Sequence, residues 1–459
     1  MPAGPSAPVT KEATLSTDYG ILASQAASLA NDAPAGIGDP LLAPARGKAK
    51  PRRILFLDHT AAMSGGEIAL LNLIRHLDRS RFTPIVALFS HGPLVDKLRQ
   101  GGVETHVLEL PERIAQTQKD NLRISTLLRL GDIVCLAGFA IRLALFTRRL
   151  KINLIHANSL KADVIGGVAG RLAGVKIIWH IRDRIADDYL PASVAWIFRR
   201  LCRILPHFVV ANSYATLSAL DGLNPGRTAV VSSGSTTVHV SSGRYHVVHD
   251  GMNSRFGEGE KAPATAPRRR PVIGLVGRLS PWKGQHIFLR AAALVRKKFP
   301  EARFQIVGSA MFSEHAYEAQ IRELTAALGL QQCVEFTGFR ENVGDLIAAM
   351  DLLVHASTLG EPFGQVVIEG MAFGKPVVAT NGGGIPEIVE DGITGILVPM
   401  SDADAMADAI CGILADPQRA EEMGRRGRER VQTHFTIQQT VARVESIYQR
   451  IIPDDLRRH

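Results

Sequence analysis

The chain has 459 residues, of which 46% are hydrophobic and 21% are charged, and its formal net charge is +9 at pH 7. A chain of this length can bury a large core in two or three domains without disulfides or a structural metal. Its four cysteines lie far apart without a CxxC pair, which argues against a zinc ribbon or a disulfide framework and is typical of a reducing cytoplasm. The positive charge suits nucleic acid, an anionic membrane or a phosphorylated substrate.

Residues 1–50 include 27 Ala, Pro, Gly or Ser residues, a composition that predicts a disordered tail. The N-terminus lacks a basic start followed by an apolar stretch, so we expect no signal peptide. The apolar run from Ile133 to Ile141 has nine residues, about half of what a bilayer span requires. The sequence therefore predicts a cytoplasmic protein without a membrane-spanning helix.

From residue 51 onward, short apolar runs alternate with segments of helical length, which predicts parallel, doubly wound sheets. In the first half the predicted strands are 53–58, 84–89, 103–108, 152–156, 175–180, 208–211 and 245–249. In the second half they are 272–276, 304–307, 334–337, 352–355, 377–380 and 396–398. We therefore expect an α/β protein of two lobes, with ligands at the carboxyl ends of the strands, where the two rows of loops face each other.

Two stretches interrupt the alternation. Residues 232–245 are small and polar, which predicts a loop or a hairpin, and residues 254–270 have the composition of a linker.

The densest cluster of polar residues runs from Glu361 to Glu369. A turn ending near Gly364 should start a helix, which leaves free backbone N–H groups around Gln365, an arrangement suited to an anion. A carboxylate in such a place accepts hydrogen bonds from sugar or ribose hydroxyls well. On spacing alone, a loop glutamate and a solvated helix glutamate are an equal alternative.

A second cluster follows the first strand of the second half. Gly277 lets a ligand approach the backbone, while Arg278 offers a planar fork and Lys283 a point charge, a pair suited to a diphosphate. The alternative is two solvated cations near a turn.

Two glycine-rich turns also follow predicted strands. Gly65 and Gly66 open an apolar-periodic helix and could let a phosphate lie on its start, although they form neither a GxGxxG fingerprint nor a phosphate loop. Residues 381–387 (Asn-Gly-Gly-Gly-Ile-Pro-Glu) are by themselves better explained as an ordinary turn.

Histidine and acidic patterns give no support for a metal site. His156 and His180 each end a predicted strand, and no HExxH or His/Cys constellation is present. Asp402 and Asp404 have the spacing of a metal-binding DxD pattern, but they directly precede a helical run, so a helix cap is the better interpretation.

Taken in order, these clusters resemble the retaining, nucleotide-sugar-dependent glycosyltransferases of the group 1, family four class, which have the two-Rossmann GT-B fold. The resemblance covers residues 52–450, and its specific part is 277–284, 361–369 and 382–387. Softer matches are at 65–67, His180, 209–213 and 247–251, and in the last of these the family's usual asparagine is Asp250.

The resemblance implies a domain arrangement. It places an acceptor-side domain at 51–253, a linker at 254–270, a donor-binding domain at 271–436, and a last helix at 437–452 that crosses back to the first domain.

The resemblance also implies roles. Arg278 and Lys283 would bind the donor diphosphate and stabilise the leaving charge, and Glu361 would hold hydroxyls of the transferred sugar. His180 would lie near that sugar, and Glu369 would hold the ribose. The other residues expected to line the donor site are Gly66, Gly277, Phe363, Gly364 and Gln365.

The reaction implied is retaining, metal-independent transfer of a hexose from a UDP- or GDP-linked sugar to a saccharide or lipid-linked acceptor, in surface polysaccharide or glycolipid biosynthesis. No cofactor is expected. The competing classes are a nucleotide-sugar epimerase or phosphorylase of the same fold, and, more remotely, a basic nucleic-acid-binding protein. We find no pyridoxal-binding lysine for a phosphorylase and no nucleic-acid-binding signature, so nucleic acid is not expected as a partner.

Two segments of the first half are both basic and apolar. Residues 113–151 carry eight Lys or Arg and two Asp, and residues 189–208 repeat the pattern. We consider a peripheral contact with anionic lipid at the inner face of the membrane. The alternative, somewhat favoured by the sequence alone, is ordinary helices with a buried stripe and solvated cations.

Overall fold

The computed structural model describes residues 50–110, 130–187, 190–220, 243–253, 270–310, 314–340 and 342–452, together with two short strands, β7 (Ser232–Ser233) and β8 (Thr236–Thr237). The predicted tail and linker therefore lie almost entirely outside the described residues. Strands β7 and β8 pair antiparallel, as in a hairpin, which was one of the two predictions for residues 232–245. They belong to a unit separate from the one that holds the other described residues.

The first lobe is built on a seven-stranded parallel sheet in the order β3-β2-β1-β4-β5-β6-β9. Its strands are β1 (Arg52–Asp58), β2 (Phe82–Leu88), β3 (Glu104–Val107), β4 (Leu154–Ala157), β5 (Lys176–Ile181), β6 (Phe208–Ala211) and β9 (Tyr245–Val247). All seven predicted strands are present. Strand β9 ends two residues before the predicted end, and the His249 ring beyond it contacts Glu387.

The second lobe has a six-stranded parallel sheet in the order β12-β11-β10-β13-β14-β15. Its strands are β10 (Val272–Val276), β11 (Arg303–Val307), β12 (Val334–Gly338), β13 (Leu352–His355), β14 (Val377–Thr380) and β15 (Ile396–Val398). All six were predicted, four of them with the same bounds. Continuous apolar runs were a reliable signal for the central strands β13 and β14, in which every residue is buried.

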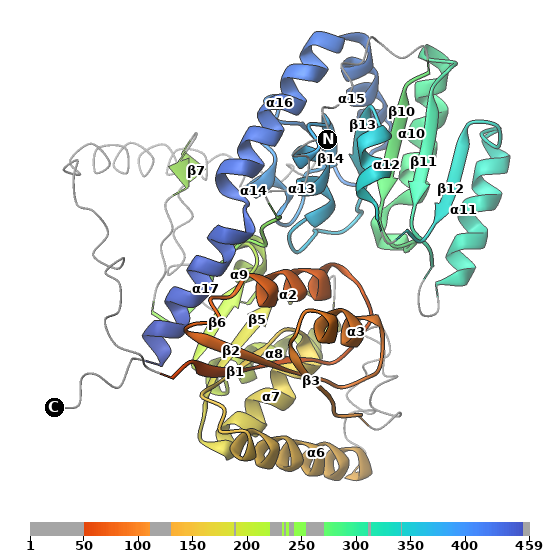
Figure 1. Cartoon of the computed structure of the whole chain (residues 1–459). Helices are drawn as coiled ribbons and strands as arrows, with labels where there is room; N and C mark the ends of the chain where they lie inside the picture. Colours follow the sequence, from red (N-terminus) through yellow and green to blue (C-terminus); the bar gives the residue numbers. More distant parts are fainter. Residues whose placement is uncertain are drawn as a thin grey trace, which may run out of the picture. The chain divides into compact units, whose positions relative to one another are not determined.

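Helices cover both faces of the first sheet (Figure 1). The first-lobe helices are α2 (Gly65–His76), α3 (Pro93–Gln100), α6 (Leu130–Arg149), α7 (Leu160–Ala173), α8 (Ala192–Ile204) and α9 (Tyr214–Leu220). On strand β1, Leu55 and Leu57 pack towards α6, α7 and α8, whereas Ile54 and Phe56 pack towards α2 and α3. The last helix, α17 (Ile437–Ile451), packs on the side of α2 and α3.

The second sheet is covered in the same way. Its helices are η3 (Pro281–Lys283), α10 (Gln285–Lys298), α11 (His315–Ala327), α12 (Gly344–Ala349), α13 (Gln365–Ala372), α14 (Ile385–Ile388), α15 (Ala403–Ala415) and α16 (Pro417–His434). Helices α10, α11 and α15 share one core with the sheet, and α12, α13, α14 and α16 share the other. Among the described helices, none combines the length and the apolar character that a membrane span requires.

The last helix is joined by hydrogen bonds to the chain that follows β9. Met252 N donates to Phe435 O at 2.8 Å, Ile437 N donates to Met252 O at 2.7 Å, and Gly251 N donates to Thr440 Oγ1 at 2.9 Å. The segments around 252 and 436 are therefore held together where the chain passes between the two sheets.

Both sheets share one topological feature that positions the functional residues. Strand β1 lies beside β4, and β10 lies beside β13, although the members of each pair are far apart in sequence. The chain leaves such neighbouring strands in opposite directions, which opens a crevice at their carboxyl ends. Loops from distant parts of the sequence meet at these two points.

Candidate functional site

The second-lobe site is centred on an ion pair between Lys283 and Glu361. Lys283 Nζ donates to both carboxylate oxygens of Glu361, at 2.8 and 2.9 Å. Lys283 follows β10 and Glu361 follows β13, so the neighbouring positions of these strands bring the two loops together. The side chains are 18% and 12% exposed, so the pair is largely withdrawn from water.

Two further side chains support the Glu361 carboxylate. Ser357 Oγ donates to Glu361 Oε2 at 3.0 Å, and His355 Nε2 lies 3.3 Å from the same oxygen. Thr380 Oγ1 lies 3.2 Å from the other ring nitrogen of His355. Burial acts to raise the pKa of Glu361, but Lys283 and His355 outweigh it and hold that pKa well below its usual range. Glu361 is therefore a fixed, ionised hydrogen-bond acceptor at neutral pH.

The glycine-rich turn after β14 holds the backbone of Glu361. Gly384 N donates to Glu361 O at 2.8 Å, and Gly383 forms an isolated parallel bridge with Glu361. Gly383 has φ +64°, and a Cβ at this position would lie 1.9 Å from Glu361 O. Only glycine combines this conformation with so close an approach of two backbones. The turn, which by itself in the sequence was better explained as an ordinary turn, thus positions Glu361.

The start of helix α13 faces the start of α2 from the other lobe. Gln365 is the first residue of α13, after the buried Phe363 and after Gly364, which has φ +123°. A Cβ on Gly65 would lie 3.3 Å from Gln365 Oε1. Two helix N-termini therefore lie close together, and the first backbone N–H groups of a helix are suited to an anion.

Arg278 and Glu369 have different surroundings from Glu361. Arg278 Nε lies 3.1 Å from Glu314 Oε2, so the two predicted diphosphate-binding cations have separate carboxylate partners. Glu369 lies in the second turn of α13, half-buried, and burial raises its pKa to about 7.

The first-lobe site lies at the carboxyl ends of β1 and β4. The buried Asp58 carboxylate accepts hydrogen bonds from Asn158 Nδ2 at 2.7 Å and from Ser159 Oγ at 2.9 Å. Beside it, Ser64 N donates to Glu67 Oε2 at 3.1 Å, which caps the start of α2. Burial, with a smaller contribution from the charge of Asp58, raises the pKa of Glu67 to about 7.

A chain of buried side chains leads from α17 to His180. Tyr448 OH lies 2.6 Å from His156 Nδ1, and His156 Nε2 lies 3.0 Å from His180 Nδ1. Arg182 Nη2 lies 3.4 Å from His180 Nδ1. A guanidinium can only donate, so His180 Nδ1 is the acceptor, His156 Nε2 is its other donor, and Tyr448 donates to His156 Nδ1. The charge of Arg182 thereby selects the tautomer of both histidines.

This arrangement makes His180 a neutral donor. Its Nε2 carries the proton and has no hydrogen-bond partner among the described residues. Burial, together with the charge of Arg182, lowers the pKa of His156 to about 3 and holds the pKa of His180 well below its usual range. Arg182 is ion-paired with Asp250, and both side chains are 5% exposed. The carboxylate at 250, where the family usually has asparagine, thus balances the buried Arg182.

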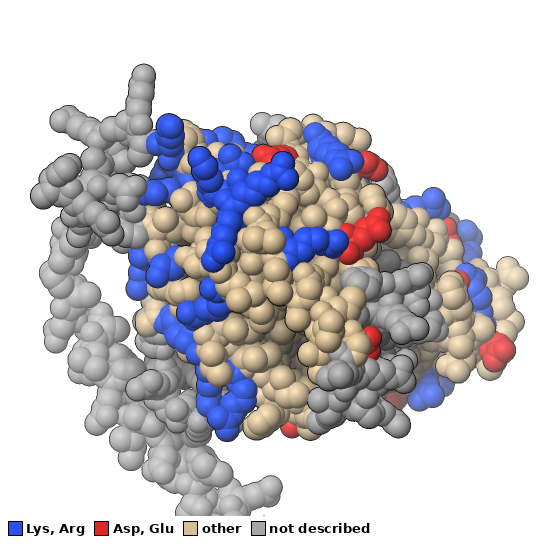
Figure 2. Space-filling view, turned by 90° about the horizontal axis from the view of Figure 1, so that it is seen from below, with Lys and Arg blue, Asp and Glu red and all other residues tan. Residues whose placement is uncertain are grey.

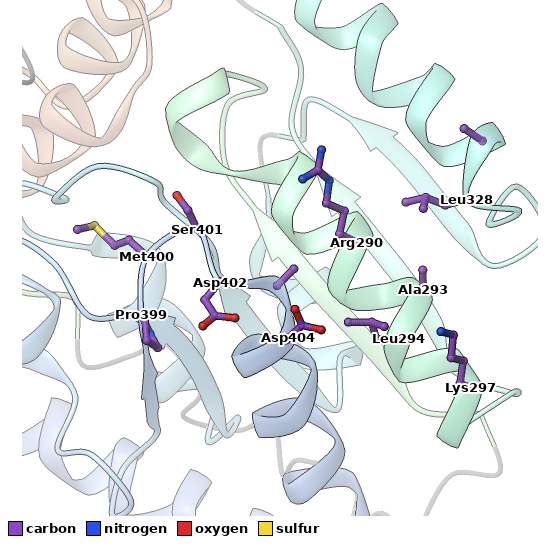
Figure 3. A pocket seen from close by; sticks show the side chains of 12 residues that line it. Arg290, Ala293, Leu294, Lys297, Leu328, Pro399, Met400, Ser401, Asp402 and Asp404 are labelled. Atoms are coloured by element: carbon purple, nitrogen blue, oxygen red, sulfur yellow. The ribbon is translucent and has the colours of Figure 1, made fainter.

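A groove of about 830 Å³ lies elsewhere in the second lobe, between α10 and the segment that leads into α15 (Figure 3). None of Lys283, Glu361 and His180 lines this groove. Asp402 lies in its wall, and its side chain accepts from Ala405 N at 2.8 Å, so it caps α15, as the sequence predicts.

Comparisons with known proteins cover both lobes. The family model "Glycosyl transferases group 1" matches residues 258–430, and "Glycosyl transferase 4-like domain" matches residues 64–234. The structure is similar to that of Anabaena Alr3699/HepE in complex with UDP-glucose, with a TM-score of 0.72 and 26% identity over 87% of this chain and 99% of that one. The chain is a group 1 glycosyltransferase with the GT-B fold.

Individual relatives match to different extents. A D-inositol 3-phosphate glycosyltransferase of Corynebacterium glutamicum (strain R) is 28% identical over 70% of this chain and 78% of its own length. The protein of the same name from Mycolicibacterium paratuberculosis is 35% identical, but the match spans 40% of this chain and 42% of that protein. These comparisons confirm the family predicted from the ordered motifs.

Several residues that contact Glu361, His355 or His156 are absent from the predicted set. His355, Ser357 and Thr380 all follow or end predicted strands on the carboxyl side, a position that could have marked them. Tyr448 had no such signal, because it reaches His156 from a helix 292 residues further along the chain.

Replacing Gly383 with alanine should destabilise the glycosyltransferase by more than about 3 kcal/mol, because the backbone strain is joined by a collision with Glu361 O. Gly392 is the matched control: it has φ +74°, but a Cβ there meets nothing within 4 Å. Gly392→Ala should cost only about 1 kcal/mol, from the left-handed conformation alone. Chemical denaturation measures both, and equal losses would show that the contact with Glu361 is unimportant.

The buried histidines predict a pH dependence of stability. Because the pKa of His156 is about 3 in the folded state, the unfolded state binds more protons below pH 6.5, and stability is lost as the pH falls. His156 alone should remove about 1.4 kcal/mol per pH unit between pH 6 and 4.

The control for this prediction is His156→Gln. Glu67 and Glu369 act in the opposite direction, since their raised pKa values favour the folded state as the pH falls through 7. These contributions cancel in the difference between the parent and His156→Gln. Equal slopes of unfolding free energy against pH in the two proteins would contradict the buried neutral histidine.

Proposed function

We propose that this glycosyltransferase moves a hexose from a UDP- or GDP-linked sugar to a hydroxyl of a saccharide or lipid-linked acceptor, with retention and without a metal. The observation that carries the proposal is the buried pair of Lys283 and Glu361 beside the N-terminus of α13. It combines a cation for a phosphate with an ionised acceptor for sugar hydroxyls.

In this proposal the second lobe binds the donor. Lys283 and Arg278 contact the diphosphate, near the Gly277 backbone and the first N–H groups of α13. Both cations now face carboxylates, so a diphosphate would share them with Glu361 and Glu314. Glu361 holds hydroxyls of the transferred sugar, and Glu369 holds the ribose.

The first lobe supplies the other side of the reaction centre. A Cβ on Gly66 would lie 3.7 Å from Arg182 Cδ, so the first turn of α2 borders the residues around His180. The Nε2 proton of His180 lacks a partner among the described residues and would be donated to an oxygen of the transferred sugar.

Electrostatic stabilisation of the leaving diphosphate would provide most of the rate. The two cations and the helix N-terminus can do this in a site with little water, which is why we propose that no metal is needed. The acceptor hydroxyl would attack on the face from which the diphosphate leaves, so that the transferred sugar keeps its α configuration.

The relatives support a role in surface glycoconjugates. The lipopolysaccharide core biosynthesis mannosyltransferase LpsB of Rhizobium meliloti is 28% identical over 60% of this chain and 80% of its own length. We propose a related role for this protein, at the cytoplasmic side of a membrane where lipid-linked acceptors are found.

The proposal is tested by screening UDP- and GDP-sugars as donors with the purified protein. Lys283→Ala should lower turnover at least about 100-fold, the effect of losing one group that stabilises transition-state charge. Glu361→Gln should also lower turnover, because it removes the ionised acceptor for sugar hydroxyls. Lys298→Ala is the control, since it removes an exposed lysine that pairs with Asp408 at 3.1 Å, and it should leave turnover unchanged.

Circular dichroism would confirm that the variants fold, and NMR of the product would show whether the anomeric configuration is retained. Absence of turnover with every nucleotide sugar, or variants as active as the parent, would contradict the proposal. Loss of activity in EDTA that is restored by a divalent cation would contradict metal independence.

A further inference from the structure

Exposed apolar side chains are concentrated on three helices of the first lobe. Of the twelve large apolar side chains that are exposed among the described residues, eight lie on α6, α7 and α8. A concentration of this kind marks a surface that contacts something other than water.

Helix α6 has an apolar stripe on its outer side as well as on its inner side. Val134, Ile141 and Leu145 are 65%, 53% and 60% exposed, and their spacings of seven and four place them on one face. Phe139 and Leu143, on the opposite face, are buried in the core. A helix at a water-facing surface should instead be polar on its outer side.

Helices α7 and α8 continue this surface. Leu172 on α7 is 49% exposed, and Trp196 and Ile204 on α8 are 56% and 65% exposed. The guanidinium of Arg200 lies 5.3 Å from the centre of the Trp196 ring. A tryptophan beside an arginine is suited to the boundary between lipid chains and headgroups.

The three helices are joined side by side at their C-terminal ends. Arg148 of α6 donates to the carbonyls of Leu172 and Ala173, which end α7. Arg171 of α7 donates to Ile204 O at 2.7 Å and to Leu205 O at 2.8 Å. The exposed side chains of α6, α7 and α8 therefore belong to one surface, which we call the α6–α8 surface.

The charge on these helices is almost entirely of one sign. They carry eight Lys or Arg and two Asp, and of the two, Asp163 is buried. Figure 2 shows the molecule from the side of α6, where Lys and Arg form a broad band among uncharged residues and Asp and Glu are few.

We infer that the α6–α8 surface docks on an anionic lipid bilayer, with its apolar side chains among the lipid chains and its arginines at the headgroups. A second copy of the chain is the less suitable occupant, because two such surfaces would bring like charges together. The inference rests on α6, α7 and α8 alone, so it stands or falls independently of the sugar transfer.

The experiment is flotation of the full chain with phosphatidylcholine vesicles, with and without phosphatidylglycerol. The protein should float with the anionic vesicles only, and 0.5 M NaCl should weaken binding. Leu145→Ser with Trp196→Ser should lower binding at least tenfold, and so should Arg149→Glu with Arg203→Glu. Arg149 and Arg203 are chosen because they cap no helix end among the described residues.

The chain offers a matched control in the second lobe, where Phe339 is 57% exposed and is followed by the exposed Arg340. Phe339→Ser with Arg340→Glu should leave vesicle binding unchanged. Failure of the parent to bind anionic vesicles, or equal binding by the α6–α8 variants, would overturn the inference. So would a dimer in sedimentation that the Leu145 and Trp196 substitutions dissociate, since it would make a second copy the occupant.

Discussion

Glu361 remains ionised in a largely buried position because Lys283 contacts both of its oxygens, and much of the second lobe serves this one interaction. The neighbouring strands β10 and β13 bring the two loops within reach. Gly383 and Gly384 hold the backbone of Glu361 from the next strand along the sheet. Without Lys283, the buried Glu361 carboxylate would either be protonated or lower the free energy of unfolding. The glycine turn contributes by holding the Glu361 backbone where Lys283 can contact it.

In the first lobe, too, a buried cation fixes the protonation of its neighbours, although these neighbours, His156 and His180, are neutral. Arg182 fixes the direction of every hydrogen bond from His180 to Tyr448, and Asp250 balances its charge. Preorganised donors and acceptors of this kind need no rearrangement when charge develops nearby. Tyr448 comes from α17, so the C-terminal end of the chain contributes to the order of a first-lobe site.

The fold was predictable because its central strands, such as β4, β13 and β14, are fully buried and appear as continuous apolar runs between helices. Lys283 and Glu361 were also predictable as candidate residues, since both lie in loops that follow those strands. Their pairing was not: Lys283 and Glu361 are 78 residues apart, and spacing gave no sign that Arg278 would turn to Glu314. The sequence marked residues 113–151 as basic and apolar, but the pattern could not show which face of α6 is buried and which is exposed.

The α6–α8 surface also bears on how an acceptor could reach the site. Helices that connect parallel strands begin near the carboxyl edge of the sheet and end near the opposite edge. Val134 and Trp196 lie in the first two turns of their helices, whereas Leu172 and Ile204 lie in the last turns, so the surface extends along the depth of the lobe. With 20 residues, α6 is about 30 Å long. A membrane on this surface would therefore reach the edge at which His156, His180 and the first turn of α2 lie, and a lipid-linked hydroxyl could approach from there.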